Sequence, residues 1–123
     1  MAKILVVDDE IDITELLMIV LKLHGHPVEV ANSAPQMFQK LHLFIPKIIL
    51  LDVMLNGENG RDLCRQLKDL PYSIDIILMS ANTDLLKDHE ECNACDVIDK
   101  PFHISDVLQK VNGLVRKMNM LGS

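Results

Sequence analysis

Three consecutive acidic residues, Asp8, Asp9 and Glu10, follow an apolar run near the start of the chain, in the segment ILVVDDE. Two like charges about 4 Å apart repel each other by roughly 4 kcal/mol at an effective dielectric constant of 20, so such crowding usually requires a cation. A further acid, Asp52, directly follows the apolar run IILL. The spacing of these acids therefore indicates a bound cation.

A hydroxyl group and an ammonium group follow two later strand-like segments, at Ser80 and Lys100. Phosphoryl transfer needs this combination, because its transition state spreads negative charge over oxygens that a cation and hydrogen-bond donors stabilise. Asp52 is the best candidate nucleophile, since a carboxylate can form an aspartyl phosphate. Lys100 would supply a compact positive charge and Ser80 a rotatable hydroxyl donor.

Apolar runs alternate with segments of helical spacing along the chain, which predicts the elements that position these residues. Strands are predicted at residues 3–7, 28–31, 48–51, 74–79 and 96–99. Helices are predicted to begin near Ile13, at a Ser33/Gln36 capping box, beyond the turn-like residues 56–60, near Asp84 and after Phe102. The first helix is expected to turn Ile13, Leu16, Leu17, Val20 and Leu21 inward, and the fourth to end near Cys92 and Asn93. Alternating strands and helices predict a parallel sheet covered on both faces.

The candidate functional residues all fall at the carboxyl ends of predicted strands: Asp8, Asp9, Asp52, Ser80 and Lys100. Ligands of open α/β sheets bind at this edge, where the winding direction reverses, so the three aspartates are expected to converge. Carboxylates with few nitrogen or sulfur ligands favour Mg²⁺, which accepts one or two of them together with waters and phosphate oxygens. The pattern therefore predicts a magnesium site.

Each of these residues also has a simpler structural explanation. Acids in the first turn of a helix are stabilised by its dipole by about 0.3 to 1 kcal/mol each. Asp52 and Ser80 could cap a loop or a helix, and Lys100 could be a surface lysine before a rigid turn. These explanations do not predict that all five polar residues share one edge of one sheet.

Composition limits the other possibilities. The chain has 123 residues, 49% of them hydrophobic, and a formal net charge of −6. This length fits one globular domain, assigned to residues 1–118 with a tail at 119–123, and the negative charge argues against direct nucleic-acid binding. Without a signal peptide or an apolar run of about 18 residues, we expect a cytoplasmic protein that does not insert into membranes.

Four motifs together carry a family resemblance: VVDDE, LLDVML followed by Gly60, LMSA, and DKPF. In this order and at these separations, the chain resembles the receiver domain of two-component response regulators, including chemotaxis receivers, over essentially its whole length. The resemblance implies an α/β, flavodoxin-like (βα)5 three-layer sandwich with a five-stranded parallel sheet of order 2-1-3-4-5. It also implies that Asp52 takes a phosphoryl group from a sensor histidine kinase or a histidine phosphotransfer protein.

The resemblance assigns metal ligands by position. Asp9 would be a direct Mg²⁺ ligand and Asp8 would act partly through water. Asp52 and the backbone carbonyl of Met54 would complete the protein ligands.

Roles toward the phosphoryl group follow in the same way. Ser80 would turn toward the phosphoryl oxygens, and the amide of the small residue Ala81 would donate to another. Lys100 would pair with Asp52 and then with its phosphate, and the Lys100-Pro101 peptide would be cis.

Three positions depart from the family pattern. Val97 stands where the family usually has Tyr or Phe, and a stiff β-branched side chain cannot make the inward swing of an aromatic ring. Asn56 replaces a common proline, and Glu58 a frequent methionine. These differences affect the expected switch and the metal-bearing loop, but no phosphotransfer residue is missing.

Two other functional classes remain open. An aspartyl-phosphate phosphatase of the haloacid dehalogenase type would need an acid where this chain has Met54. The other class is a binding module of the same fold. A flavin carrier would need a phosphate-binding loop of amide donors after the first strand, where this chain has acids. A receiver that is not phosphorylated would be expected to lack one of the five polar residues.

The three cysteines do not indicate a zinc site or a disulfide framework. Cys92 and Cys95, with His89 upstream, lack a second ligand pair of suitable spacing, so ordinary reduced thiols are expected. The remaining histidines are expected at solvated positions.

The sequence thus favours a phosphoacceptor that catalyses its own phosphorylation and dephosphorylation but is not otherwise an enzyme. It is expected to be a monomer or weak dimer that signals to an unknown downstream effector. The family resemblance alone implies that the signalling face is formed by the fourth helix, the fifth strand and the fifth helix.

Overall fold

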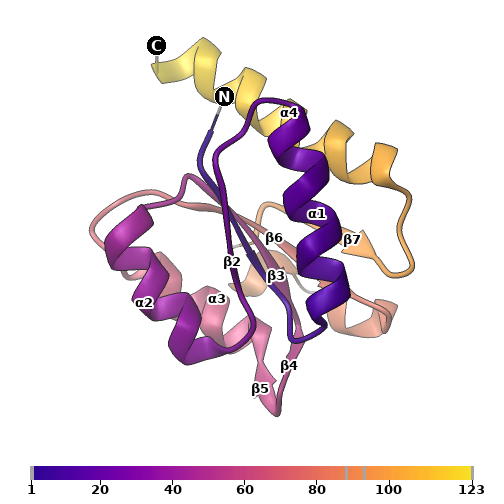
Figure 1. Cartoon of the computed structure of the whole chain (residues 1–123). Helices are drawn as coiled ribbons and strands as arrows, with labels where there is room; N and C mark the ends of the chain where they lie inside the picture. The colour runs from indigo at the N-terminus through magenta and orange to yellow at the C-terminus, as the bar shows by residue number, and fades with distance from the viewer. Residues whose placement is uncertain (1, 88, 93, 123) are drawn as a thin grey trace.

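The computed structural model describes residues 2–87, 89–92 and 94–122, and its centre is a five-stranded parallel sheet (Figure 1). The strands are β1 (Ile4–Val7), β2 (Val28–Ala31), β3 (Ile48–Asp52), β6 (Asp75–Ser80) and β7 (Asp96–Asp99). Their order in the sheet is β2-β1-β3-β6-β7, with every neighbouring pair parallel. The predicted order 2-1-3-4-5 is confirmed, and all strands end at the same edge.

Helices cover both faces of the sheet, which explains why the central strands β1 and β3 are almost entirely apolar. The helices α1 (Ile11–Leu23) and α4 (Ile104–Gly122) lie on one face, and α2 (Ala34–Phe44) and α3 (Gly60–Lys68) on the other. Successive residues of β1 point to opposite faces: Ile4 and Val6 join the core under α1 and α4, whereas Leu5 and Val7 join the core under α2 and α3. The three-layer sandwich is therefore filled by two separate cores.

The start of α2 has the predicted capping interactions. The Ser33 hydroxyl oxygen accepts a hydrogen bond from the Gln36 backbone N–H at 3.3 Å, and the Gln36 side chain accepts one from the Asn32 backbone N–H at 2.8 Å. The reciprocal bond thus reaches one residue further back than in a standard capping box.

The fourth predicted helix is wrong in type. The described residues of this segment form two short 3₁₀ turns, η1 (Thr83–Leu86) and η2 (His89–Cys92), in place of an α-helix, and Asp88 lies outside the described residues. Leu86 and Cys92 are the buried residues of these turns and lie six residues apart, a separation that does not place them on one face of an α-helix. Asn93, predicted at the helix end, lies outside the described residues.

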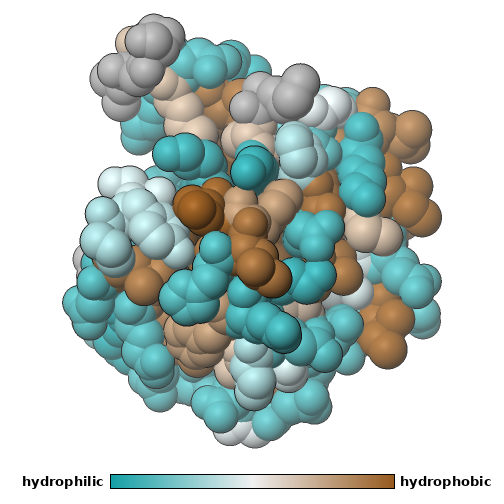
Figure 2. Space-filling model, turned by 60° about the vertical axis from the view of Figure 1, so that its left-hand side comes forward, coloured by the Kyte–Doolittle hydropathy of each residue, from teal (hydrophilic) through white to brown (hydrophobic). Residues whose placement is uncertain are grey.

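The predicted inward face of α1 is correct for Leu17 and Leu21 but wrong for Leu16, which is 44% exposed. Thr14 is buried in its place, because its hydroxyl donates to the Ile11 carbonyl at 2.9 Å and accepts from Asn32 Nδ2 at 3.3 Å. Figure 2 shows hydrophobic side chains at the surface among hydrophilic ones.

Two further segments differ from the expected pattern. The turn-like residues after β3 form a small antiparallel hairpin, β4 (Met54–Leu55) and β5 (Glu58–Asn59). The last helix continues to Gly122, through residues assigned to a tail.

His26 is buried rather than solvated: its Nδ1 accepts a hydrogen bond from the Ala2 backbone N–H at 3.3 Å, and burial lowers its pKa.

Candidate functional site

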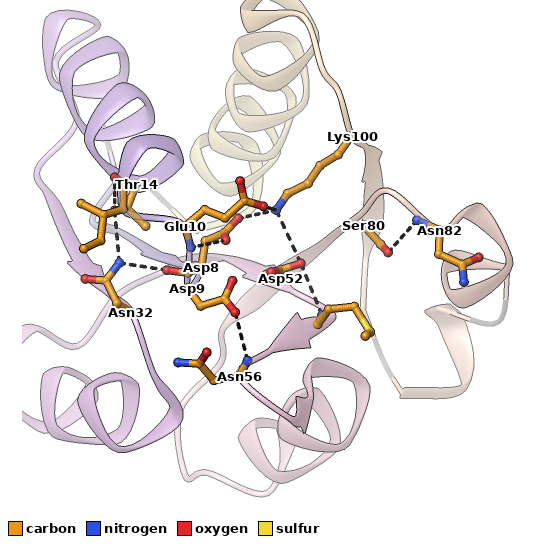
Figure 3. A network of polar contacts seen from close by, with 12 residues as sticks. Asp8, Asp9, Glu10, Thr14, Asn32, Asp52, Asn56, Ser80, Asn82 and Lys100 are labelled. Atoms are coloured by element: carbon orange, nitrogen blue, oxygen red, sulfur yellow. Dashed lines mark hydrogen bonds and ion pairs between the residues drawn. The ribbon is translucent and has the colours of Figure 1, made fainter.

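The predicted polar residues meet at the carboxyl edge of the sheet (Figure 3). Asp8 follows β1, Asp52 ends β3, Ser80 ends β6 and Lys100 follows β7. A cleft of about 420 Å³ opens at this edge, and its lining includes Asp9, Asp52, Ser80, Ala81 and Lys100. Four strands that are distant in sequence therefore bring these side chains to one place.

Three carboxylates come close enough to share one cation. One oxygen from each of Asp8, Asp9 and Asp52 lies within 4.8 Å of the others. Asp8 is fully buried and Asp52 is 4% exposed. Within residues 2–87, 89–92 and 94–122, this is the group of three or more His, Cys, Asp or Glu side chains that could hold a metal ion. A hard divalent cation fits this all-oxygen donor set.

Lys100 is closer to Asp8 than to Asp52. Its Nζ lies 2.5 Å from Asp8 Oδ2, 3.6 Å from Asp52 Oδ1 and 3.8 Å from Glu10 Oε1. Burial lowers the pKa of this ammonium, but the hydrogen bond and the charge of Asp8 outweigh burial, and the net direction is upward. The expected pairing with Asp52 is therefore present only as the longer of two contacts with buried acids.

The pKa of the Asp52 carboxyl is raised well above its ordinary value. Burial and the nearby charge of Asp8 raise its pKa from 3.8 to about 6, although Lys100 and the Met54 N–H favour the ionised form. The protein thus leaves negative charge incompletely compensated beside Asp52, which is the situation that a bound cation would relieve.

Backbone amides hold the acids in place. The Met54 N–H donates to Asp52 Oδ1 at 3.3 Å, the Asn56 N–H to Asp9 Oδ2 at 3.1 Å, and the Glu10 N–H to Asp8 Oδ1 at 3.0 Å. The Met54 side chain is 63% exposed, so it is the backbone of this residue that faces the acids. The Met54 backbone is thus close to Asp52, and its carbonyl stays a predicted metal ligand.

Ser80 and Ala81 line the same cleft with different exposure. Ser80 is 1% exposed, and its hydroxyl oxygen accepts a hydrogen bond from the Asn82 backbone N–H at 3.0 Å. Ala81 is exposed at the surface of the cleft. The Lys100-Pro101 peptide is cis, as the resemblance implied.

Sequence reasoning noted Glu10, Asn56 and Gly60 but did not predict what they do at this site. Asn56 holds Asp9 through its backbone, and Glu10 approaches Lys100. A Cβ on Gly60 would lie 2.3 Å from the Asp52 carbonyl oxygen, so this position requires glycine. The Asn56-Gly57 dipeptide, with φ angles of 48° and 82°, is a hairpin signal that could have indicated the β4–β5 turn.

Two of the three cysteines are buried, Cys64 in α3 and Cys92 in η2, and neither lines the cleft. Cys64 donates from its thiol to the Cys92 carbonyl at 3.0 Å, and the Cys92 thiol donates to the His89 carbonyl at 3.2 Å. Burial raises the pKa of Cys64 to about 12, so its thiol stays protonated at neutral pH.

The fold and the site define an α/β protein with an acidic, lysine-containing pocket at the switch point of a doubly wound sheet. Residues 4–112 match the family model of the response regulator receiver domain. The chain therefore belongs to the receiver domain family of two-component response regulators.

Similar proteins agree with this assignment. The chain is 34% identical over 117 residues to the DNA-binding response regulator MtrA of Mycobacterium tuberculosis H37Rv, covering 94% of this chain and 51% of MtrA. It is 32% identical over 118 residues to the CpxR homolog of Haemophilus influenzae, covering 95% and 52%. The chain thus spans about half the length of these curated relatives.

Solved structures show the same fold. The receiver domain of NtrX from Brucella abortus superimposes with a TM-score of 0.82 at 27% identity, covering 89% of this chain and 94% of that one. A CheY-like receiver domain protein from Methanospirillum hungatei gives a TM-score of 0.88 at 24% identity, covering 98% of each chain, and supports the fold alone. In the described part of the chain, a helix of sufficient length and hydropathy to span a bilayer was not found.

Proposed function

We propose that Asp52 is the phosphoacceptor of this receiver domain, which we assign to residues 1–118. The observation that carries the proposal is the convergence of Asp52 with Asp8, Asp9 and Lys100 at one edge of the sheet. A carboxylate nucleophile beside an ammonium and a cation-binding acid pair is suited to phosphoryl transfer.

We assign each residue of the site a separate role in phosphoryl transfer. Asp8, Asp9, Asp52 and the Met54 carbonyl would hold Mg²⁺, which when bound neutralises charge on the phosphoryl oxygens. Lys100 approaches Asp52 to 3.6 Å and can follow the phosphoryl group with its ammonium. The Ser80 hydroxyl oxygen accepts from the Asn82 N–H, so its own O–H can donate to a phosphoryl oxygen. The exposed Ala81 leaves space and an amide donor beside it.

The phosphoryl donor is a histidine kinase or a histidine phosphotransfer protein. The phosphorus–nitrogen bond of its phosphohistidine breaks as a phosphorus–oxygen bond to Asp52 forms. Asp52 is consumed and must be restored by hydrolysis, so the domain is a self-catalysed phosphoacceptor rather than an enzyme acting on a separate substrate. The added charge, about −1.5 to −2, would change the binding of a downstream effector.

Acetyl phosphate provides a direct test. Incubation with this donor, with and without Mg²⁺, followed by intact mass measurement should give a gain of one phosphoryl group that requires the metal. The gain should disappear in Asp52→Asn and persist in Asp99→Asn, which changes an exposed acid on β7. A metal-dependent gain that survives in Asp52→Asn would place the acceptor elsewhere and overturn the proposal.

A further inference from the structure

Glu10 occupies the N-cap position of α1 without using its side chain as a cap. It makes no side-chain capping hydrogen bond, and Glu is not among the residues that stabilise this position. Its backbone N–H donates to Asp8, while its carboxylate is 64% exposed and lies 3.8 Å from Lys100 Nζ. The side chain is therefore directed at the functional site rather than at the helix.

The Lys100 ammonium is shared among three carboxylates (Figure 3). Two of them, Asp8 at 2.5 Å and Asp52 at 3.6 Å, are almost completely buried, and Glu10 is the exposed third. Glu10 also lines the cleft and a second hollow beside it that includes Ile13 and Phe102. Glu10 is thus the one of these acids that can be changed without burying an unpaired charge.

We propose that Glu10 is a positioning residue for phosphoryl transfer, which holds the Lys100 ammonium toward Asp8 and away from Asp52. The inference rests on the proposed function of Asp52. When Asp52 takes up a phosphoryl group, negative charge increases on its side of Lys100, and the ammonium moves to it. Glu10 opposes this movement, so its carboxylate slows the transfer reaction.

The first test compares two single-charge changes on the same helix. Glu10→Gln removes the carboxylate near Lys100, and Asp12→Asn removes an exposed acid in the first turn of α1. The rate of phosphorylation by acetyl phosphate at saturating Mg²⁺ is followed by intact mass. We expect Glu10→Gln to react about two- to fivefold faster than wild type, the size of effect typical of a partly exposed ion pair. Asp12→Asn should match wild type.

A second variant separates position from charge. Glu10→Asp keeps the negative charge but shortens the side chain by one methylene, so it loses the contact with Lys100. A positioning role predicts that Glu10→Asp reacts as fast as Glu10→Gln, whereas a general electrostatic role predicts the wild-type rate. Calorimetric Mg²⁺ titration supplies a readout other than rate, and the affinity should change equally in Glu10→Gln and Asp12→Asn.

Three results would overturn the inference while leaving the proposed function intact: equal rates in Glu10→Gln and Asp12→Asn, a wild-type rate in Glu10→Asp, or a loss of Mg²⁺ affinity specific to Glu10→Gln. The last result would make Glu10 an outer ligand of the metal. If wild-type protein took up no phosphoryl group at all, the function of Asp52 itself would be wrong, and the inference would be lost with it.

Discussion

Gly60 lies directly against the backbone of Asp52, so that a Cβ at this position would be 2.3 Å from the Asp52 carbonyl oxygen and 2.8 Å from Val53 Cα. The Gly60 N–H also donates to the Val53 carbonyl at 2.7 Å. The start of α3 is thus packed onto the strand that carries the candidate phosphoacceptor. Because the contacting atoms are backbone, they cannot move aside as a flexible side chain would.

Gly60→Ala should therefore destabilise the protein by about 1 to 3 kcal/mol, the usual cost of forced overpacking. Gly113→Ala is the matched control, because Gly113 lies in α4 with no heavy atom within 4 Å of an added Cβ. In that helical position alanine should stabilise by about 0.5 to 1 kcal/mol. Urea unfolding of both variants measures the two effects, and a Gly60→Ala protein as stable as wild type would contradict the packing argument.

Lys100 compensates the fully buried charge of Asp8. Lys100→Met should therefore destabilise the protein by about 3 to 5 kcal/mol, because it leaves Asp8 buried without a partner. Adding Asp8→Asn to Lys100→Met should restore most of this loss, since the unpaired charge is then gone. Denaturant unfolding measures the stability of both variants, and EDTA is included so that metal binding does not contribute. Equal destabilisation in the single and double variants would show that Lys100 stabilises by packing instead.

Because the pKa of Asp52 is raised in the folded state, its contribution to the free energy of unfolding should fall as the pH rises. The folded state holds the proton up to about pH 6, whereas the unfolded chain releases it near 3.8. The stabilisation from this protonated carboxyl is complete below pH 3.8 and is lost as the pH rises through 6. Asp52→Asn should therefore be more stable than wild type by about 1 to 3 kcal/mol at pH 7 without metal.

The advantage of Asp52→Asn should shrink as the pH falls from 6 to 4. Saturating Mg²⁺ should also reduce it, because the ion binds the wild-type acids and stabilises their folded state. Unfolding free energies between pH 4 and 8 provide the measurement, with the exposed Asp99→Asn as control. A pH-independent difference would show that burial does not control the acidity of Asp52.

The sheet and the position of the site could be predicted because strands that are buried on both faces appear in the sequence as continuous apolar runs. β1 and β3 are buried at every residue, so their apolar runs leave little choice of element, and polar residues appear where each run ends. The convergence of Asp8, Asp52 and Lys100 then follows from parallel topology alone.

Contacts that satisfy polar groups locally could not be predicted in this way. Thr14 is buried because Ile11 and Asn32 satisfy its hydroxyl, while the more apolar Leu16 is exposed, and hydropathy assigns the two residues the other way round. The preference of Lys100 for Asp8 over Asp52 depends on about one ångström of side-chain placement, which spacing along the chain does not encode.

Ile45, which follows α2, has a left-handed backbone conformation with φ 51° and ψ 69°. This region is unfavourable for a β-branched residue, and glycine usually occupies it at helix ends. The side chain is 51% exposed, so little packing is lost when it is removed. Ile45→Gly should therefore stabilise the protein by about 1 kcal/mol, and Ile45→Val, which keeps the branch, should give no gain. Thermal unfolding of the two variants decides, and a destabilised Ile45→Gly would mean that the exposed isoleucine contributes packing that outweighs its backbone strain.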